Sequence, residues 1–228
     1  MQPIFEHPTT ALHGSYLGEV VSVKDPENLS RVQVRLFNFD GNQHDAPIWA
    51  RVAVPVAGSS YGAFLLPDVG DEVLITFVNG DSRLPMVIGS LWNGNAPAPE
   101  TLGGSGETVD RWTLVGKAQT RIAIVEEHPG NATISLTTPG GVSGTLTQTA
   151  GGKIEFEAAG TTITVDTTGV TVQSAGRVNV SASQVEVTAG QVTVNAAISN
   201  FSGVVKCDTL IATTVVSTTY TPGAGNIW

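Results

Sequence analysis

The sequence has only one cysteine, Cys207, and it contains no run of roughly 18 apolar residues. A single cysteine excludes a disulfide framework within the chain and a metal site built from several cysteines. The N-terminal residues lack the basic start and apolar core of a secretory signal. We therefore expect synthesis in the cytoplasm without a signal peptide, and a fold that closes without covalent cross-links.

Charge is also scarce, and its balance is acidic. Charged residues make up 14% of the chain, the formal net charge is -9 and the isoelectric point is about 4.8. Proteins that bind nucleic acid concentrate lysine and arginine, because these side chains displace the counterions of the phosphates. The composition therefore argues against a nucleic-acid partner.

The N-terminal half predicts short strands separated by turns. Apolar or alternating segments are interrupted by turn-forming pairs such as Asp25-Pro26 and Gly80-Asp81. The expected strands cover residues 18–23, 31–39, 47–53, 71–79 and 85–91. Five short strands without helical periodicity predict a small β-barrel. Within 31–36, Val32, Val34 and Leu36 alternate with polar residues, so we expect these three inside the barrel.

A stretch of proline, glycine, serine and glutamate without periodicity divides the sequence in two. It follows Leu91-Trp92-Asn93-Gly94 and ends before Arg111, and it predicts a linker. The expected organisation is an N-terminal extension at residues 1–15, a barrel domain at 16–94, a linker at 95–110, a β-helical domain at 111–217 and a C-terminal tip segment at 218–228.

Beyond the linker, pairs of apolar residues separated by one residue recur along the chain. The pairs are Ile122/Ile124, Ile134/Leu136, Ile154/Phe156, Ile163/Val165, Val170/Val172, Val178/Val180, Val185/Val187 and Val192/Val194. From Ile163 onward the first members stand 7, 8, 7 and 7 residues apart. Apolar residues two apart follow the period of a strand, whereas a coiled-coil heptad spaces them three and four apart. We therefore predict an internal repeat of one short strand and a bend.

Each predicted strand has about two inward side chains, too few for one thin chain to enclose a core. Three chains wound about a common axis remove this difficulty, because each contributes a wedge and strand edges pair with neighbouring chains. The predicted fold is therefore all-β, with a barrel followed by an intertwined, triple-stranded β-helix. The residues expected to face the trimer axis are Ile163, Val165, Val170, Val172, Val178, Val180, Val185, Val187, Val192 and Val194.

Five motifs in the barrel half are similar to a known family. In chain order they are Gly18–Pro26 (GEVVSVKDP), Arg31–Arg35 (RVQVR), Trp49–Ala53 (WARVA), Pro67–Ile75 (PDVGDEVLI) and Gly89–Gly94 (GSLWNG). Together they resemble the OB domain of phage baseplate assembly protein V and of VgrG spike proteins. The valine, threonine and glycine repeats that follow resemble the β-helical needle of the same family.

The resemblance implies a structural role and no enzymatic activity. A protein of this family is the central spike of a contractile injection apparatus, which is a phage tail or a tail-like particle. The resemblance implies a homotrimer whose OB-fold end attaches to the baseplate hub. Its needle punctures the target envelope on sheath contraction, so the target membrane is contacted only during puncture. Effector cargo is a further expected partner.

The sequence departs from this family in three respects. Few residues precede the first predicted strand, so we expect the hub to be a separate protein. The linker is too short for the cell-wall hydrolase of some relatives, and the C-terminus lacks the His-x-His pair with which some spikes bind iron. We therefore expect a PAAR-type tip protein to cap the needle, with Tyr220, Ile227 and Trp228 as candidate contacts. The alternative is that the last residues seal the end themselves.

No catalytic residue, metal site or cofactor is predicted. The four histidines lack ligand spacing, and no serine stands in Gly-x-Ser-x-Gly. Glu155 and Glu157 flank Phe156, so they are expected outside the needle, where they do not form the acid pair of a cleft. Two alternative functions remain: a tailspike-like polysaccharide depolymerase, and an OB-fold binder of single-stranded nucleic acid.

Overall fold

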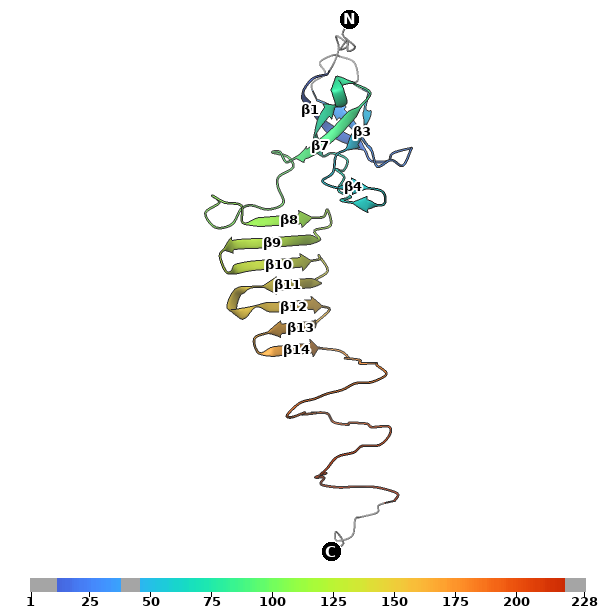
Figure 1. Ribbon diagram of the computed structural model, residues 1–228, viewed down its shortest axis with the longest axis vertical. Helices are drawn as coiled ribbons and strands as arrows, with labels where there is room; N and C mark the ends of the chain where they lie inside the picture. Colours follow the sequence, from blue (N-terminus) through green and yellow to red (C-terminus); the bar gives the residue numbers. More distant parts are fainter. Residues whose placement is uncertain (1–11, 38–45, 220–228) are drawn as a thin grey trace, which may run out of the picture. The chain divides into compact units, whose positions relative to one another are not determined.

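The computed structural model describes residues 12–37 and 46–219, and these residues contain strands and short 3-10 turns but no α-helix (Figure 1). The chain divides into two units, one ending at Arg177 and the other beginning at Val178. The first unit contains a closed barrel and a separate seven-stranded sheet. The all-β class predicted from the sequence is confirmed.

Five strands close the barrel in the order β1-β2-β3-β7-β6. They are β1 (Ser15–Ser22), β2 (Val32–Leu36), β3 (Ile48–Val52), β6 (Glu72–Phe77) and β7 (Pro85–Leu91). All neighbours pair antiparallel except β3 and β7, which pair parallel. These are the five strands that the turn signals predict, and the 3-10 turn Val78–Gly80 follows β6.

The barrel interior is made almost entirely of valine and isoleucine. The fully buried members are Val20, Val32, Val34, Ala50, Val73, Ile75 and Val87. Val32 and Val34 thus lie inside as predicted, and Leu36 packs against this core. Burying one such side chain stabilises the fold by roughly 1.5–3 kcal/mol. At Gly18 a Cβ atom would stand 2.6 Å from the carbonyl oxygen of Arg35, so glycine permits the close approach of β1 and β2.

A short hairpin between β3 and β6 was not predicted from the sequence. It consists of β4 (Ala57–Gly58) and β5 (Tyr61–Gly62), which pair with each other and with no other strand. The hairpin and the residues after it expose large apolar side chains, including Tyr61 and Phe64. Strands of two residues lie below the length at which alternation becomes visible in a sequence.

The seven-stranded sheet is an antiparallel meander in which every strand pairs with its neighbour in sequence (Figure 1). Its strands are β8 (Arg111–Val115), β9 (Arg121–His128), β10 (Asn131–Thr137), β11 (Ser143–Thr147), β12 (Lys153–Ala158), β13 (Thr161–Asp166) and β14 (Gly169–Ser174). The 3-10 turn Thr149–Gly151 connects β11 and β12.

The meander differs from the expectation that strand edges pair between chains. Between Arg111 and Ser174 each interior strand finds both hydrogen-bonding neighbours in its own chain. Tight turns with glycine in the left-handed region cause this difference, as at Gly130 (φ 83°) and Gly160 (φ 75°). A turn of this kind returns the chain at once, so the next strand pairs with the previous one.

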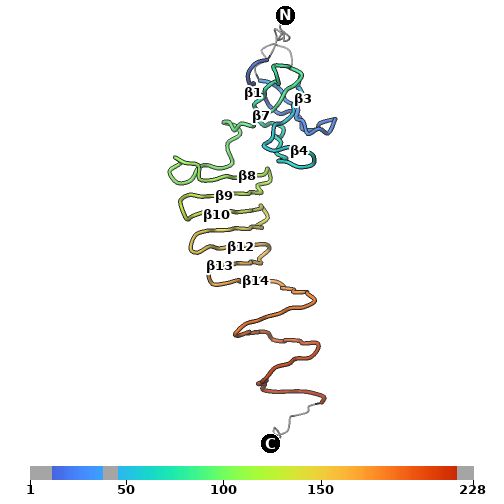
Figure 2. The backbone as a smooth tube through the Cα atoms, in the orientation of Figure 1, coloured from blue at the N-terminus to red at the C-terminus, as the bar shows by residue number. Residues whose placement is uncertain are grey.

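The second unit is extended and unpaired within one chain. Among its described residues, 178–219, there is no strand and no hydrogen bond between backbone groups. Figure 2 shows this segment running back and forth in wide passes. The intertwined β-helix predicted for this part of the sequence therefore stays a prediction.

Candidate assembly interface

One face of the β8–β14 sheet is apolar on every strand and is uncovered in a single chain. Its members are Trp112, Leu114, Ile122, Ile124, Ile134, Leu136, Leu146, Ile154, Phe156, Ile163, Val165, Val170 and Val172. Their exposed fractions run from 37% at Ile154 to 70% at Val170. We call this surface the apolar face.

The strand register aligns these side chains in two columns across the sheet. One column contains Trp112, Ile124, Ile134, Leu146, Ile154, Val165 and Val170. The other contains Leu114, Ile122, Leu136, Gly144, Phe156, Ile163 and Val172. Side chains directly opposite each other on neighbouring strands lie in contact distance, so each column is a continuous apolar ridge.

The second column has one position without a side chain, Gly144, and the ring of Phe156 occupies the space beside it. A Cβ atom at Gly144 would stand 3.1 Å from Cδ1 and from Cε1 of Phe156. Gly144 is accordingly buried although its strand neighbour Leu146 is exposed. This glycine explains why the pattern of apolar pairs in the sequence missed Leu146, whose partner two residues earlier is Gly144.

The opposite face of the sheet is polar. It contains Thr133, Ser135, Thr145, Thr147, Lys153, Glu155, Glu157, Thr162 and Thr164, which alternate with the apolar residues along the strands. Glu155 and Glu157 lie there, away from Phe156, as the strand period predicts, and Lys153 forms an ion pair with Glu155. The two faces therefore differ sharply, and only one of them is made of side chains that favour removal from water.

The ten residues predicted to face a trimer axis fall into two groups. Ile163, Val165, Val170 and Val172 lie on the apolar face, where Ile163 is opposite Val172 and Val165 is opposite Val170. The other group is Val178, Val180, Val185, Val187, Val192 and Val194, which are 61–71% exposed and have no strand partner in the chain. An axial position for both groups stays a prediction. Tyr220, Ile227 and Trp228 lie outside the described residues.

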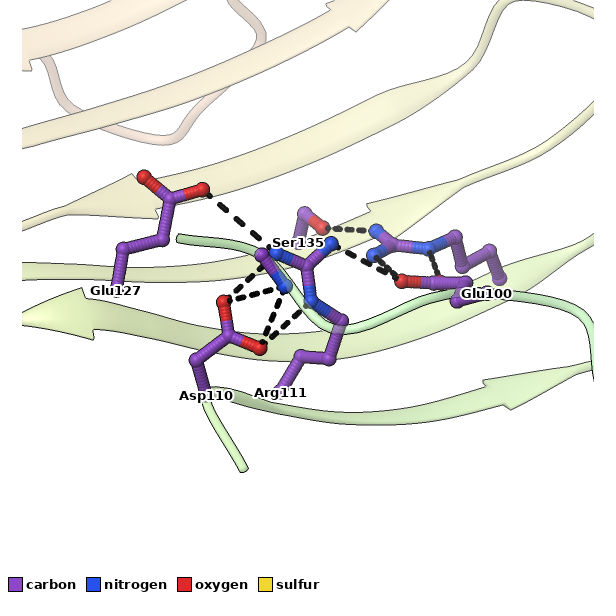
Figure 3. Close-up of polar contacts among 7 residues, drawn as sticks. Glu100, Asp110, Arg111, Glu127 and Ser135 are labelled. Carbon is purple, nitrogen blue, oxygen red and sulfur yellow. Dashed lines mark hydrogen bonds and ion pairs between the residues drawn. The ribbon is translucent and has the colours of Figure 1, made fainter. Parts of the chain in front are cut away.

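Part of the predicted linker is held against the start of the sheet by ion pairs that the sequence analysis missed (Figure 3). The Arg121 guanidinium donates to both carboxylate oxygens of Glu100, from Nε at 2.5 Å and from Nη2 at 3.1 Å. Its Nη1 donates to Ser135 Oγ at 3.1 Å. Arg121 lowers the pKa of the Glu100 carboxyl below its usual value.

A second ion pair lies beside the first. Arg111 donates from Nη2 and Nε to the Asp110 carboxylate at 2.8 and 3.0 Å, and the backbone N–H of Gly103 donates to the same group at 3.1 Å. These hydrogen bonds, that of Arg111 above all, lower the pKa of Asp110 to about 2. Arg111 also lies 3.7 Å from Glu127 and from Glu100. Isolated charges in a glycine-rich stretch gave no periodic signal from which this cluster follows.

The described residues offer little support for chemistry at other positions. None of them form a group of three or more histidine, cysteine or acidic side chains placed to hold a metal ion. Arg31, which stands over the Trp49 ring, is engaged by Asp25 at 2.8 Å and by Glu27 at 3.0 Å. Arg83 is likewise paired with Asp81 at 2.7 Å. Within the described ranges no helix is long and apolar enough to cross a membrane.

Comparison with known proteins places the barrel in a family. The sequence model of the type VI secretion system and phage-baseplate injector OB domain matches residues 16–92. The type VI secretion system spike protein VgrG3 of Vibrio cholerae is 35% identical over 78 residues, which are 33% of this chain and 8% of VgrG3. The spike protein VgrG4b of Pseudomonas aeruginosa is 35% identical over 108 residues, which are 44% of this chain and 13% of VgrG4b.

A further relative has a different printed function. The actin cross-linking toxin VgrG1 of Vibrio cholerae is 36% identical over 63 residues, which are 28% of this chain and 6% of the toxin. The chain thus spans only a small part of the length of these relatives. The matched region agrees with the five sequence motifs and with the closed barrel. Residues 16–92 therefore belong to the type VI secretion system and phage-baseplate injector OB domain family, and the chain that carries them is VgrG-like.

Proposed function

We propose that this chain is the structural central spike of a contractile injection apparatus and acts as a homotrimer. The observation that carries the proposal is the uncovered apolar face of the β8–β14 sheet. The barrel family and the spike proteins among the relatives support the same role.

Monomeric soluble proteins rarely expose continuous apolar patches larger than a few hundred Å². The apolar face continues over seven strands, and each of its leucine, isoleucine or phenylalanine side chains contributes roughly 1.5–3 kcal/mol when fully buried. Copies of the same chain are suitable partners, because their apolar faces are identical in size and carry no charge. Association of these faces therefore accounts for an otherwise unfavourable surface.

The extended segment favours three copies over two. Its backbone donors and acceptors have no partner in the chain, and such groups are rarely left unpaired once buried. Its passes lie farther apart than the paired strands of the meander (Figure 2). Strands from two other copies inserted between successive passes would supply these hydrogen bonds and enclose the paired valines. The three apolar faces of the meander would then line a triangular prism.

In this proposal the trimer works mechanically and not as an enzyme. The OB-fold end attaches to the baseplate hub, and sheath contraction drives the needle through the target envelope. The needle resists shear because unfolding one chain requires breaking its contacts with the other two. A PAAR-type tip protein caps the C-terminal end and effector cargo travels with it, while the target membrane is contacted only during puncture.

A complementation experiment tests the role. Producing cells that lack this protein are supplied with the wild-type chain or with a chain truncated after Arg177, and contractile particles are purified and assayed for puncture of target cells. We expect particles with full puncturing activity only from the wild type. Normal particles and normal puncture without any copy of the chain would refute a spike function.

A further inference from the structure

The two edges of the β8–β14 sheet have different shapes. One edge has a hollow beside the apolar face, next to the turn that connects β11 and β12. Its floor includes Ile134, Leu146 and Ile154, and its outer part includes the small residues Ala132, Gly151 and Gly152. The hollow therefore continues the apolar face to the border of the sheet.

The backbone of the β11–β12 turn keeps this hollow open. Gly151 and Gly152 both have φ 91°, a conformation that other residues adopt only with strain. At Gly151 a Cβ atom would also stand 2.6 Å from Cγ2 of Thr167. Larger residues are thus disfavoured at both positions, and the hollow is a built feature of the turn.

The opposite edge carries a projecting turn, Thr138–Val142, between β10 and β11. Val142 is 49% exposed and stands two residues before Gly144, so strand alternation places it with the apolar face. The turn is well tied: the backbone N–H of Thr138 donates to the carbonyl of Val142 at 2.9 Å, and the N–H of Val142 donates to Thr138 Oγ1 at 3.2 Å. The turn presents an apolar side chain in a fixed position.

Symmetry brings these two features together. This step rests on the proposed trimer: in a closed ring of three identical sheets, one edge of each copy meets the other edge of the next copy at the same level. Val142 precedes β11 at one edge, and Gln148, which lines the hollow, follows β11 at the other. We propose that the Thr138–Val142 turn of each copy inserts into the hollow of the next, and that this contact fixes the level at which the three sheets join.

The charges around the hollow fit an uncharged occupant such as this turn. Two charged residues line the hollow, Lys153 and Asp166, and both have partners in their own chain. Lys153 pairs with Glu155, and Asp166 accepts hydrogen bonds from the backbone and the hydroxyl of Thr168 at 2.8 and 2.6 Å. The turn Thr138-Pro139-Gly140-Gly141-Val142 has no charge. A charged ligand would leave its charge without a partner in this hollow.

Disulfide trapping tests the contact in the full chain. With Cys207→Ser as background, Val142→Cys is combined with Gln148→Cys, and in the control with Thr167→Cys. Thr167 follows β13, two strands from β11, which is about 10 Å at the usual strand spacing. A disulfide requires Cα atoms closer than about 7 Å. We expect a covalent trimer on non-reducing gels from the first pair and none from the control.

The outcomes separate this inference from the proposed function. A non-covalent trimer in native mass spectrometry without cross-links in the first pair, or with cross-links only in the control, would overturn the turn-in-hollow contact and leave the trimer standing. A monomeric wild-type chain would overturn both. If the cysteine pair prevents assembly, Val142→Asp decides: we expect its trimer to dissociate several degrees below wild type, whereas Val109→Asp, in the exposed linker, leaves the dissociation temperature unchanged. Equal dissociation temperatures for Val142→Asp and wild type would refute the contact.

Discussion

The barrel and the meander use the same strand-forming residues, yet only the barrel buries them within one chain. Val32, Val34 and Ile75 are completely buried in the barrel, whereas Ile124 and Ile134 in the meander are 41% and 45% exposed. The difference lies in topology: β1 pairs with both β2 and β6, so the barrel closes, while the meander leaves β8 and β14 as free edges. A closed sheet provides its own core, and an open one needs a partner for its apolar face.

The residues after Val178 extend this comparison by one step. The meander lacks cover for one face but satisfies its backbone, whereas the segment 178–219 lacks partners for both side chains and backbone. Dependence on other copies thus increases along the sequence. The following predictions test this gradient.

The largest effect is expected from a charge on the apolar face. Ile134→Asp would place three carboxylates in a core that excludes water, at a cost of several kcal/mol per group. We expect this variant to be monomeric by light scattering, with its barrel still folded. Thr133→Asp, the adjacent position on the polar face, serves as the matched control and should remain trimeric. If both variants assemble equally, the apolar face is not the interface.

A charge in the extended segment comes next. Val180→Asp should abolish the resistance of the trimer to SDS, because each inward position occurs three times at one level of the needle. Asn179→Asp adds the same charge one residue away, where alternation directs the side chain outward, and should retain SDS resistance. Equal resistance of the Val180→Asp trimer and wild type would show the inward assignment to be wrong.

A cavity in the barrel should have a smaller effect of a different kind. Ile75→Ala removes a fully buried side chain, and such substitutions cost roughly 2–5 kcal/mol. Because the barrel closes within one chain, its unfolding midpoint in denaturant should fall equally at low and high protein concentration. Ile163→Ala, on the apolar face, should show a loss that grows as the protein is diluted. A concentration-dependent loss for Ile75→Ala would contradict the independence of the barrel core.

The smallest effect on stability is expected in the ion pairs that hold the linker. Arg121→Ala leaves Glu100 without its main partner, so residues 95–110 should be cleaved faster in limited proteolysis. The global free energy of unfolding should change by about 1 kcal/mol or less, because both side chains are partly exposed. Arg83→Ala removes an exposed pair in the barrel and serves as a control without effect on linker cleavage. Unchanged cleavage after Arg121→Ala would mean that this pair does not hold the segment.

The same segment should respond to acid. Arg111 holds the pKa of Asp110 at about 2, below the value of about 4 for an unfolded aspartate. A lowered pKa stabilises the folded form above the unfolded value, and this stabilisation is lost as the pH falls from about 4 to about 2. Pepsin should therefore cleave the linker faster near the lower pH, once its own pH dependence is corrected with an unstructured peptide. Asp110→Asn should remove this additional dependence, and an identical profile for both proteins would exclude Asp110 as its source.

The sequence predicted the barrel strands well because their alternation is interrupted by turn residues at each end. It also predicted most of the apolar face, since pairs such as Ile154 and Phe156 follow the strand period. Leu146 was missed because Gly144 takes the place of its partner, and Trp112 and Leu114 lie before the repeat begins. The ion pairs of Glu100 and Asp110 depend on contacts between residues distant in sequence, which no local pattern encodes.

Native mass spectrometry of the full chain at micromolar concentration tests most directly whether the apolar face and the extended segment are covered by other copies. The account predicts a dominant species of three times the 23.6 kDa chain mass, with little monomer or dimer. A stable monomer, with the apolar face exposed in solution, would contradict it.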